Sequence, residues 1–184
     1  KISWDAVDGA EKYQVYRADS EDGTYESLKT TTSKSYTDSS ATAGKTYYYK
    51  VKAIADDTDA NSAYSEISSK LCKLARPDVT AEVVASSGLV ELTWEAVDKA
   101  TGYEIYRATS KSGKYSLVAQ IESVSWHDAT ASVGKTYYYK VKAIMTDNSG
   151  ANSAASAAVG KTCDLARPTL SLSNVASTGK VKVS

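Results

Sequence analysis

The chain has 184 residues, which is enough for one large domain or two of ordinary size. Lysine plus arginine (22) balances aspartate plus glutamate (22), so the formal net charge is zero. This balance argues against a nucleic-acid partner, which would need a clustered basic surface. No apolar run is long enough to insert into a membrane. With one histidine and two cysteines, most metal-binding and thiol chemistry is excluded, while the 14 tyrosines favour half-buried β-strands.

The chain repeats itself. The segment 44–54, Gly-Lys-Thr-Tyr-Tyr-Tyr-Lys-Val-Lys-Ala-Ile, recurs unchanged at 134–144, which is 90 residues later. After a one-residue insertion the offset becomes 91, and Cys72 then aligns with Cys163. A fixed long period predicts tandem copies of one folding unit.

The repeat sets the expected domain boundaries. We expect a first module at 1–76 that lacks its opening strand and a complete module at 77–167. Residues 168–184 would be the opening strands of a third module. This arrangement indicates a segment of a longer tandem array.

The predicted strands are clearest in the second copy. They lie at 89–94, 103–107, 115–121, 125–128, 136–145 and 153–162, and an opening strand within 77–88 makes about seven. In the first of these runs Val90, Leu92 and Trp94 point to one side, which is the period of a strand with one buried face. A two-sheet sandwich of antiparallel strands buries one face of each strand, so the sequence predicts an all-β fold.

Three motifs recur in both copies. They are a Trp that ends the second strand (Trp4 and Trp94), Tyr-x-Val/Ile-Tyr-Arg in the third strand, and the Tyr-rich segment quoted above. Together they resemble fibronectin type III modules, most closely those of surface proteins and secreted glycanases of Gram-positive bacteria. The resemblance covers essentially the whole chain and implies tandem immunoglobulin-like sandwiches in an extracellular, cell-surface or secreted protein. It also implies that Tyr47 and Tyr137 form the tyrosine corner, with the hydroxyl bonded back to the backbone.

The resemblance implies a structural role. Such modules would be non-catalytic spacers that position neighbouring domains of the parent protein, without a cofactor, a metal or a catalytic residue. Pro77 and Pro168 lie in the short connections after each copy. Because proline fixes φ and extends the preceding residue, we expect these connections to be stiff and to hold the modules as a rod.

A binding module is the alternative function. Tyr16, Tyr48, Tyr106 and Tyr138 point outward on the predicted strands and would form an aromatic face. Such a face would stack on a polysaccharide or dock a host surface protein. Cross-strand pairing explains the same rings without a ligand, because aromatic neighbours stabilise a sheet by about 0.2–1 kcal/mol each.

The remaining polar candidates have simpler explanations. Cys72 and Cys163 are predicted to pack as small apolar side chains at the module junctions, with intermolecular pairing as the alternative. His127 has no partners at the spacing that a metal or catalytic site needs. The acidic loop 56–59 offers carboxylates for Ca²⁺, but its counterpart 146–149 keeps only one, so a solvated turn is predicted.

The expected ends of the chain suggest self-association. Without an opening strand, the strand at 2–4 would present an unpaired sheet edge. The segment 169–175 would be an opening strand without a module to join. Exchange of this strand between molecules predicts head-to-tail association.

Overall fold

The computed structural model describes residues 1–175 and 180–183. In these ranges the secondary structure consists of β-strands and the short 3₁₀ helices η1 (Thr58–Ala60) and η2 (Ser149–Ala151). The chain forms two compact units. Unit 1 contains Lys1–Ala75 with Asp98–Ala100 and Ile144–Ser153, and unit 2 contains the other described residues. No helix in the described ranges has the length and hydropathy of a membrane span.

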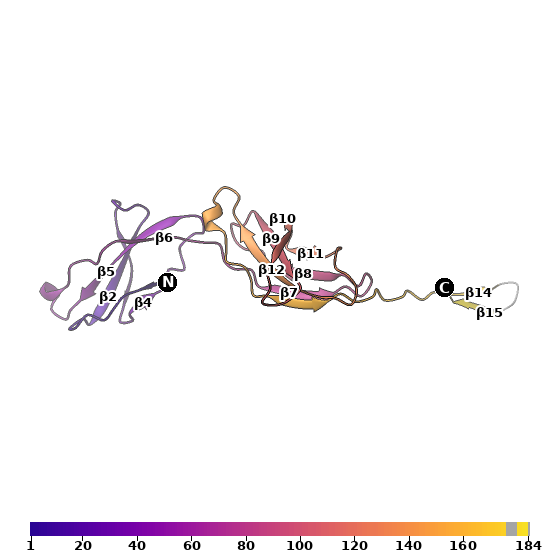
Figure 1. The fold of residues 1–184 in the computed structure, drawn as a ribbon. Helices are drawn as coiled ribbons and strands as arrows, with labels where there is room; N and C mark the ends of the chain where they lie inside the picture. Colours follow the sequence, from indigo (N-terminus) through magenta and orange to yellow (C-terminus); the bar gives the residue numbers. More distant parts are fainter. Residues whose placement is uncertain (176–179, 184) are drawn as a thin grey trace. The chain divides into compact units, whose positions relative to one another are not determined.

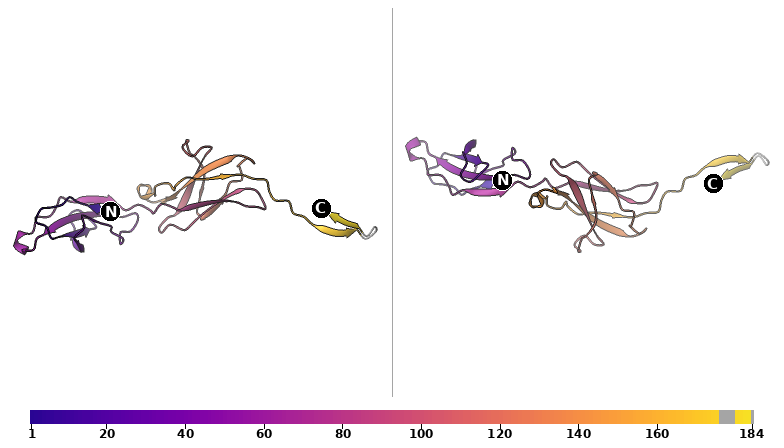
Figure 2. Two further views of the ribbon diagram at one scale, coloured as in Figure 1. Left: turned by 90° about the horizontal axis from the view of Figure 1, so that it is seen from below. Right: turned by 90° about the horizontal axis from the view of Figure 1, so that it is seen from above.

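Unit 2 holds two antiparallel sheets. The three-stranded sheet has the order β11-β8-β7 and the four-stranded sheet the order β10-β9-β12-β13. The strands are β7 (Val79–Val83), β8 (Val90–Trp94), β9 (Gly102–Ala108), β10 (Ser116–Ile121), β11 (Ser125–His127), β12 (Thr136–Ile144) and β13 (Val159–Thr162). Their course can be followed in Figure 1 and from two further sides in Figure 2. The predicted all-β sandwich is confirmed.

The core of unit 2 comes from side chains that alternate along the strands. On β8, Val90 and Leu92 are fully buried, whereas Thr93 between Leu92 and Trp94 is exposed. The inward side chains of β9 and β12 are Tyr103, Ile105, Tyr139, Val141 and Ala143. Because each strand contributes one apolar face, the two sheets enclose a core of their own.

Unit 1 repeats the four-stranded sheet in the order β3-β2-β5-β6. Its strands are β1 (Ile2–Ser3), β2 (Lys12–Ala18), β3 (Glu26–Thr31), β4 (Ser35–Tyr36), β5 (Thr46–Ile54) and β6 (Ser68–Leu71). Within the described residues β1 pairs only with β4, whereas its counterpart β8 lies between β11 and β7. In the part of the chain that the structure describes, the edge of β1 opposite β4 therefore carries no strand.

The last strand of the second copy is shorter than the sequence predicts. In unit 2 only Val159–Thr162 of the expected 153–162 is a strand. Upstream, Ser156 binds Val141 twice, since its N–H donates to the Val141 carbonyl (2.8 Å) and its Oγ accepts from the Val141 N–H (3.0 Å). A serine side chain thus takes the place of a backbone carbonyl, and the regular ladder begins only beyond it.

The C-terminal segment forms a hairpin. Strand β14 (Leu172–Val175) pairs antiparallel with β15 (Lys180–Val183), and Leu172 lies opposite Val183. The opening strand expected within 169–175 is therefore paired along one edge with the next strand of its own chain.

Candidate functional site

A buried aspartate is the centre of a polar cluster in unit 2. Asp128 follows β11 and is completely buried. Its Oδ2 accepts hydrogen bonds from Arg107 Nη1 on β9 (2.7 Å) and from the Tyr139 hydroxyl on β12 (2.9 Å). Its Oδ1 accepts from the Thr130 N–H (3.0 Å) and hydroxyl (2.8 Å). All four acceptor positions of the carboxylate are therefore used by donors of the protein.

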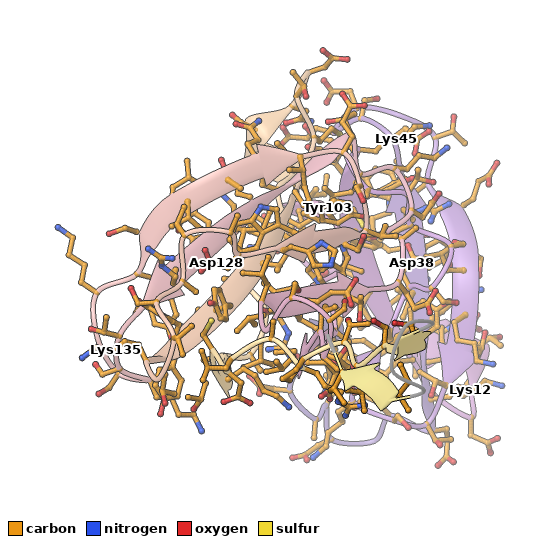
Figure 3. All side chains as sticks on the ribbon, turned by 90° about the vertical axis from the view of Figure 1, so that its right-hand side faces the viewer. Lys12, Asp38, Lys45, Tyr103, Asp128 and Lys135 are labelled. Atoms are coloured by element: carbon orange, nitrogen blue, oxygen red, sulfur yellow. The ribbon has the colours of Figure 1, made fainter. Side chains whose placement is uncertain are left out.

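Unit 1 builds the same cluster from equivalent residues. Asp38 Oδ2 accepts from Arg17 Nη1 (2.8 Å) and the Tyr49 hydroxyl (2.9 Å). Its Oδ1 accepts from the Ser40 N–H (3.0 Å) and hydroxyl (2.8 Å). We call these two sets the Arg–Asp–Tyr clusters; their aspartates are labelled in Figure 3.

The electrostatics of the clusters stabilise the charged aspartate. Burial by itself raises the pKa of the Asp128 carboxyl, but hydrogen bonds from Arg107, Thr130 and Tyr139 outweigh it and hold that pKa below its usual value of 3.8. Asp38 shows the same balance and the same direction of its pKa. Burial, and then the adjacent carboxylate, raise the pKa of the Tyr139 hydroxyl, so this tyrosine stays a neutral donor.

The arrangement is suited to holding strands together. Each arginine also lies over a tyrosine ring, with Arg17 Cζ 4.6 Å from the Tyr47 centroid and Arg107 Cζ 4.7 Å from the Tyr137 centroid. Such stacking adds a cation–π attraction to the ion pair. Since every acceptor of the aspartate is occupied, the cluster ties β9, β12 and the turn after β11 to one another.

The aspartate clusters predict a loss of stability in acid. A carboxyl whose folded pKa is depressed contributes stability above its unfolded pKa, and this contribution disappears as the pH falls through the folded pKa. We expect the urea midpoint of the full chain to fall as the pH drops below about 4. The double variant Asp38→Asn/Asp128→Asn should show a shallower slope over pH 5–2, measured by tyrosine and tryptophan fluorescence. Equal slopes would contradict the assignment.

The tyrosines predicted to form the corner bind the backbone five residues upstream. The Tyr47 hydroxyl accepts from the Thr42 N–H at 3.2 Å, and the Tyr137 hydroxyl accepts from the Ser132 N–H at 3.3 Å. The hydrogen bond from Ser132 lowers the pKa of Tyr137. The ring of Tyr47 is buried and that of Tyr137 is half-buried.

A second pair of tyrosine hydroxyls holds the turn after each Trp strand. The Tyr13 hydroxyl accepts from the Val7 N–H, and the Tyr103 hydroxyl accepts from the Val97 N–H, both at 2.9 Å. Each ring also packs on the tryptophan of its own unit, at 5.5 Å between centroids for Trp4 and 5.2 Å for Trp94. Tyr13 and Tyr103 occupy the same position in the two copies, and this repetition was the available sequence signal that both tyrosines have the same role.

The prolines of the two connections differ in environment. Pro77 is buried, and Pro168 is exposed. The peptide bonds of the described chain include no cis bond, so both act through their fixed φ alone.

The four outward tyrosines are half-buried. Tyr16 and Tyr48 belong to unit 1, and Tyr106 and Tyr138 belong to unit 2. The Tyr16 hydroxyl donates to Gln14 Oε1, and the Tyr106 hydroxyl donates to Glu104 Oε2, both at 2.7 Å. The charged acceptor, and then burial, raise the pKa of Tyr106 to about 12. These rings are thus supported by neighbours within their own sheets.

The other sequence candidates form no metal-binding group. Among the described residues, no set of three or more His, Cys, Asp or Glu side chains is placed to hold a metal ion. In the acidic loop the Asp57 carboxylate accepts from the Asp59 N–H and caps η1. His127 Nε2 lies 3.3 Å from Glu91 Oε1 at the surface. Cys72 and Cys163 are free thiols, half-buried and buried respectively.

Parts of the chain are similar to segments of amylopullulanases and of an exoglucanase. It is 34% identical over 119 residues to an amylopullulanase of Thermoanaerobacter thermohydrosulfuricus, which is 63% of this chain and 8% of that protein. It is 31% identical over 170 residues to exoglucanase B of Cellulomonas fimi, which is 84% of this chain and 14% of that protein. The chain therefore spans a small part of the relatives it matches. No protein-family model matches it.

Solved structures show a similar fold. An Fn3-like protein from Clostridium thermocellum is 28% identical, with a TM-score of 0.42 over 54% of this chain and 97% of that one. The chicken interferon gamma receptor alpha chain is 13% identical, with a TM-score of 0.63 over 88% of this chain and 89% of that one. The sheet order and the likeness to this receptor chain show antiparallel β-sandwiches, which is the fold that the resemblance of the repeated motifs to fibronectin type III modules implied.

Proposed function

We propose that this chain is a non-catalytic spacer of an extracellular bacterial protein, and that it holds neighbouring domains at a set separation. The observation that supports this most is the occupation of every acceptor position of Asp38 and Asp128 by internal donors. The most polar buried groups are thus engaged in stabilising the sandwiches. The similarity to short segments of large glycan-degrading enzymes supports a place beside other domains.

The proposed modules are 1–76, 77–167 and the opening strands at 168–184. The connection between the first two contains Leu74, whose side chain is buried. Buried Pro77 follows. A short connection with buried side chains and a proline that fixes φ favours a spacer over a flexible tether.

Pulsed EPR tests the spacer role. Spin labels at Glu26→Cys and Ser116→Cys, in a Cys72→Ser/Cys163→Ala background, report the separation of two exposed strand ends. We expect a narrow distance distribution for the full chain. A Gly-Ser-Gly-Ser insertion after Arg76 is the control and should broaden it. A distribution as broad as that of the insertion variant would rule out the spacer.

A second candidate function is binding of a polysaccharide or a host surface protein through the tyrosine-bearing sheet. One observation favours it, namely an exposed tyrosine of unit 1, Tyr64, which packs edge-on against Tyr16 at 5.2 Å between centroids. Its counterpart in unit 2 is Ala155. Head-to-tail self-association is a further proposed interaction, supported by the bare edge of β1 and the exposed Leu170 and Leu172 next to and in β14.

A further inference from the structure

The outer side of the four-stranded sheet in unit 1 gathers lysines and tyrosines. Tyr13 and Val15 of β2 are buried, so the residues between and beside them face outward. Strand register places Gln14 opposite Lys52 and Tyr16 opposite Lys50, and an isolated bridge joins Lys52 to Tyr64. We call this surface the Lys–Tyr face; it consists of Lys12, Gln14, Tyr16, Lys50, Lys52 and Tyr64.

The lysines of the Lys–Tyr face keep their charge uncompensated. Lys50 Nζ lies 4.0 Å from the centroid of the Tyr64 ring and 4.2 Å from that of the Tyr25 ring. Lys52 Nζ lies 5.5 Å from the Tyr64 centroid. Within the described ranges, none of the ion pairs below 4 Å involves Lys12, Lys50 or Lys52. Contact with an aromatic ring fixes the position of an ammonium group but does not neutralise its charge, so these lysines can still bind an anion.

Unit 2 provides a natural comparison. At the equivalent positions Lys12 becomes Gly102, Gln14 becomes Glu104 and Tyr64 becomes Ala155. Glu104 Oε2 lies 3.4 Å from Lys142 Nζ and also accepts from the Tyr106 hydroxyl. Unit 2 has thus lost one cation and one exposed ring and has gained a carboxylate that neutralises a lysine. These three differences make the face of unit 1 the more basic and the more aromatic at these positions, while unit 1 also carries the exposed Glu66 where unit 2 has Ala157.

The basic character is confined to one end of the face. At the other end the turn before β3 carries Glu21 and Asp22, and burial followed by these two charges raises the pKa of Tyr25. An anion would therefore be repelled near Tyr25. It would be attracted to the end formed by Lys12 and Lys52 (Lys12 is labelled in Figure 3).

We propose that the Lys–Tyr face of unit 1 binds an acidic polysaccharide, a glycan whose sugar rings carry carboxylates. Lys50 and Lys52 are two residues apart on β5, so their stems are spaced by roughly 7 Å along the strand. A regular row of cations matches a polymer with regularly repeated anions. This inference specifies the ligand of the binding function proposed above and rests on it.

The other groups of the face favour a sugar over an acidic protein segment. Gln14 Nε2 donates to Ser27 Oγ at 3.0 Å and its Oε1 accepts from Tyr16, so amide and hydroxyl groups lie between the cations. Such groups match sugar hydroxyls, and the Tyr64 ring offers an apolar edge. A protein partner would instead need a desolvated pocket for a large apolar anchor. The face consists of lysines, tyrosines and an amide, without an aliphatic side chain that would line such a pocket.

Calorimetric titration of the full chain tests this inference. The probes are polygalacturonate, neutral pullulan and poly-glutamate at low salt. We expect polygalacturonate to bind most tightly and its binding to weaken with added NaCl. The variant Gln14→Glu/Tyr64→Ala, which carries the residues of unit 2 at these two positions, should bind at least about tenfold more weakly, because the introduced carboxylate neutralises Lys52 and the ring contact is lost. These surface changes leave both cores intact, so unchanged thermal unfolding serves as the folding control.

The reciprocal variant, Glu104→Gln/Ala155→Tyr, should add a second binding site in unit 2. Equal affinity for polygalacturonate and poly-glutamate would show that charge alone is read and would overturn the inference, as would unchanged binding of the unit 1 variant. Binding of pullulan but not of polygalacturonate would overturn the acidic ligand and leave the binding function. If none of the probes binds, both the acidic-polysaccharide ligand and the binding function are ruled out.

Discussion

Replacing Asp128 by alanine is expected to lower the free energy of unfolding of unit 2 by about 3–5 kcal/mol. The reason is that the substitution removes the acceptor of Arg107, Tyr139 and Thr130 and leaves these donors without a partner. Arg107, Tyr139 and Thr130 direct donors at a carboxylate that is completely buried. Without it the guanidinium keeps its charge in a poorly hydrated place, and the cost of an uncompensated ion exceeds that of an ordinary lost hydrogen bond.

Calorimetry of the full chain measures this effect. Asp128→Ala should shift the transition of unit 2, and Asp38→Ala should shift that of unit 1. The control is Glu82→Ala, which breaks the exposed pair of Glu82 Oε2 with Lys161 Nζ at 2.9 Å. An exposed ion pair contributes about 0–1 kcal/mol. Similar losses for Asp128→Ala and Glu82→Ala would show that the buried cluster does not stabilise the sandwich.

Replacing Gly88 by alanine is expected to lower the stability of unit 2 by roughly 2–5 kcal/mol. Gly88 has a φ of +70°, in the left-handed region that residues with a Cβ avoid. An added Cβ would also collide with the backbone carbonyl of Asp164 and lie 2.8 Å from the Ala166 nitrogen. The Gly88 carbonyl accepts from the Asp164 N–H and from the Cys163 thiol, so the clash would disturb both contacts.

Gly134→Ala is the matched control. Gly134 has a similar φ of +76°, but nothing lies within 4 Å of the Cβ that alanine would add. Its substitution should cost about 1–2 kcal/mol for the backbone conformation alone. The difference between the two variants, from urea unfolding, isolates the close approach of the segment after β13 to Gly88. Equal losses would mean that the segment moves aside.

The strands were predictable because their information is local. Alternation in 89–94 placed Val90, Leu92 and Trp94 on one side, and all three are buried. The same pattern in 136–145 identified the inward side of β12. Only the last strand was predicted too long, because a serine side chain replaced the backbone partner there.

The Arg–Asp–Tyr clusters were not predictable from alternation. Arg107 follows the outward Tyr106 in the strand, yet it forms an ion pair with a buried aspartate 21 residues away. The aspartate lies in a turn, where the strand alternation of inward and outward side chains does not apply and therefore predicts nothing about burial. The available signal was the repeat itself, because the arginine, the aspartate and the tyrosine are each kept in both copies.

The Lys–Tyr face was predicted in part. Of its residues, Tyr16 was identified from the sequence as pointing outward. Tyr64 was missed because it lies in a loop after η1, where only tertiary contact brings it onto β5. The difference in charge between the two units depends on which residue lies across the strand from Lys52 or Lys142, and this follows from register rather than from composition.

The two sandwiches share one strand sequence. β5 and β12 both read Thr-Tyr-Tyr-Tyr-Lys-Val-Lys-Ala-Ile, and each carries the tyrosine that closes its own cluster. A nascent chain therefore contains two interchangeable central strands, and an exchange between repeats would satisfy most of the same hydrogen bonds. Since domains fold in order as they leave the ribosome, early closure of the first sandwich removes its strand from competition before the second is made. Refolding from denaturant lacks this order. Under those conditions we expect the chain to misfold by exchanging the central strand between its two repeats.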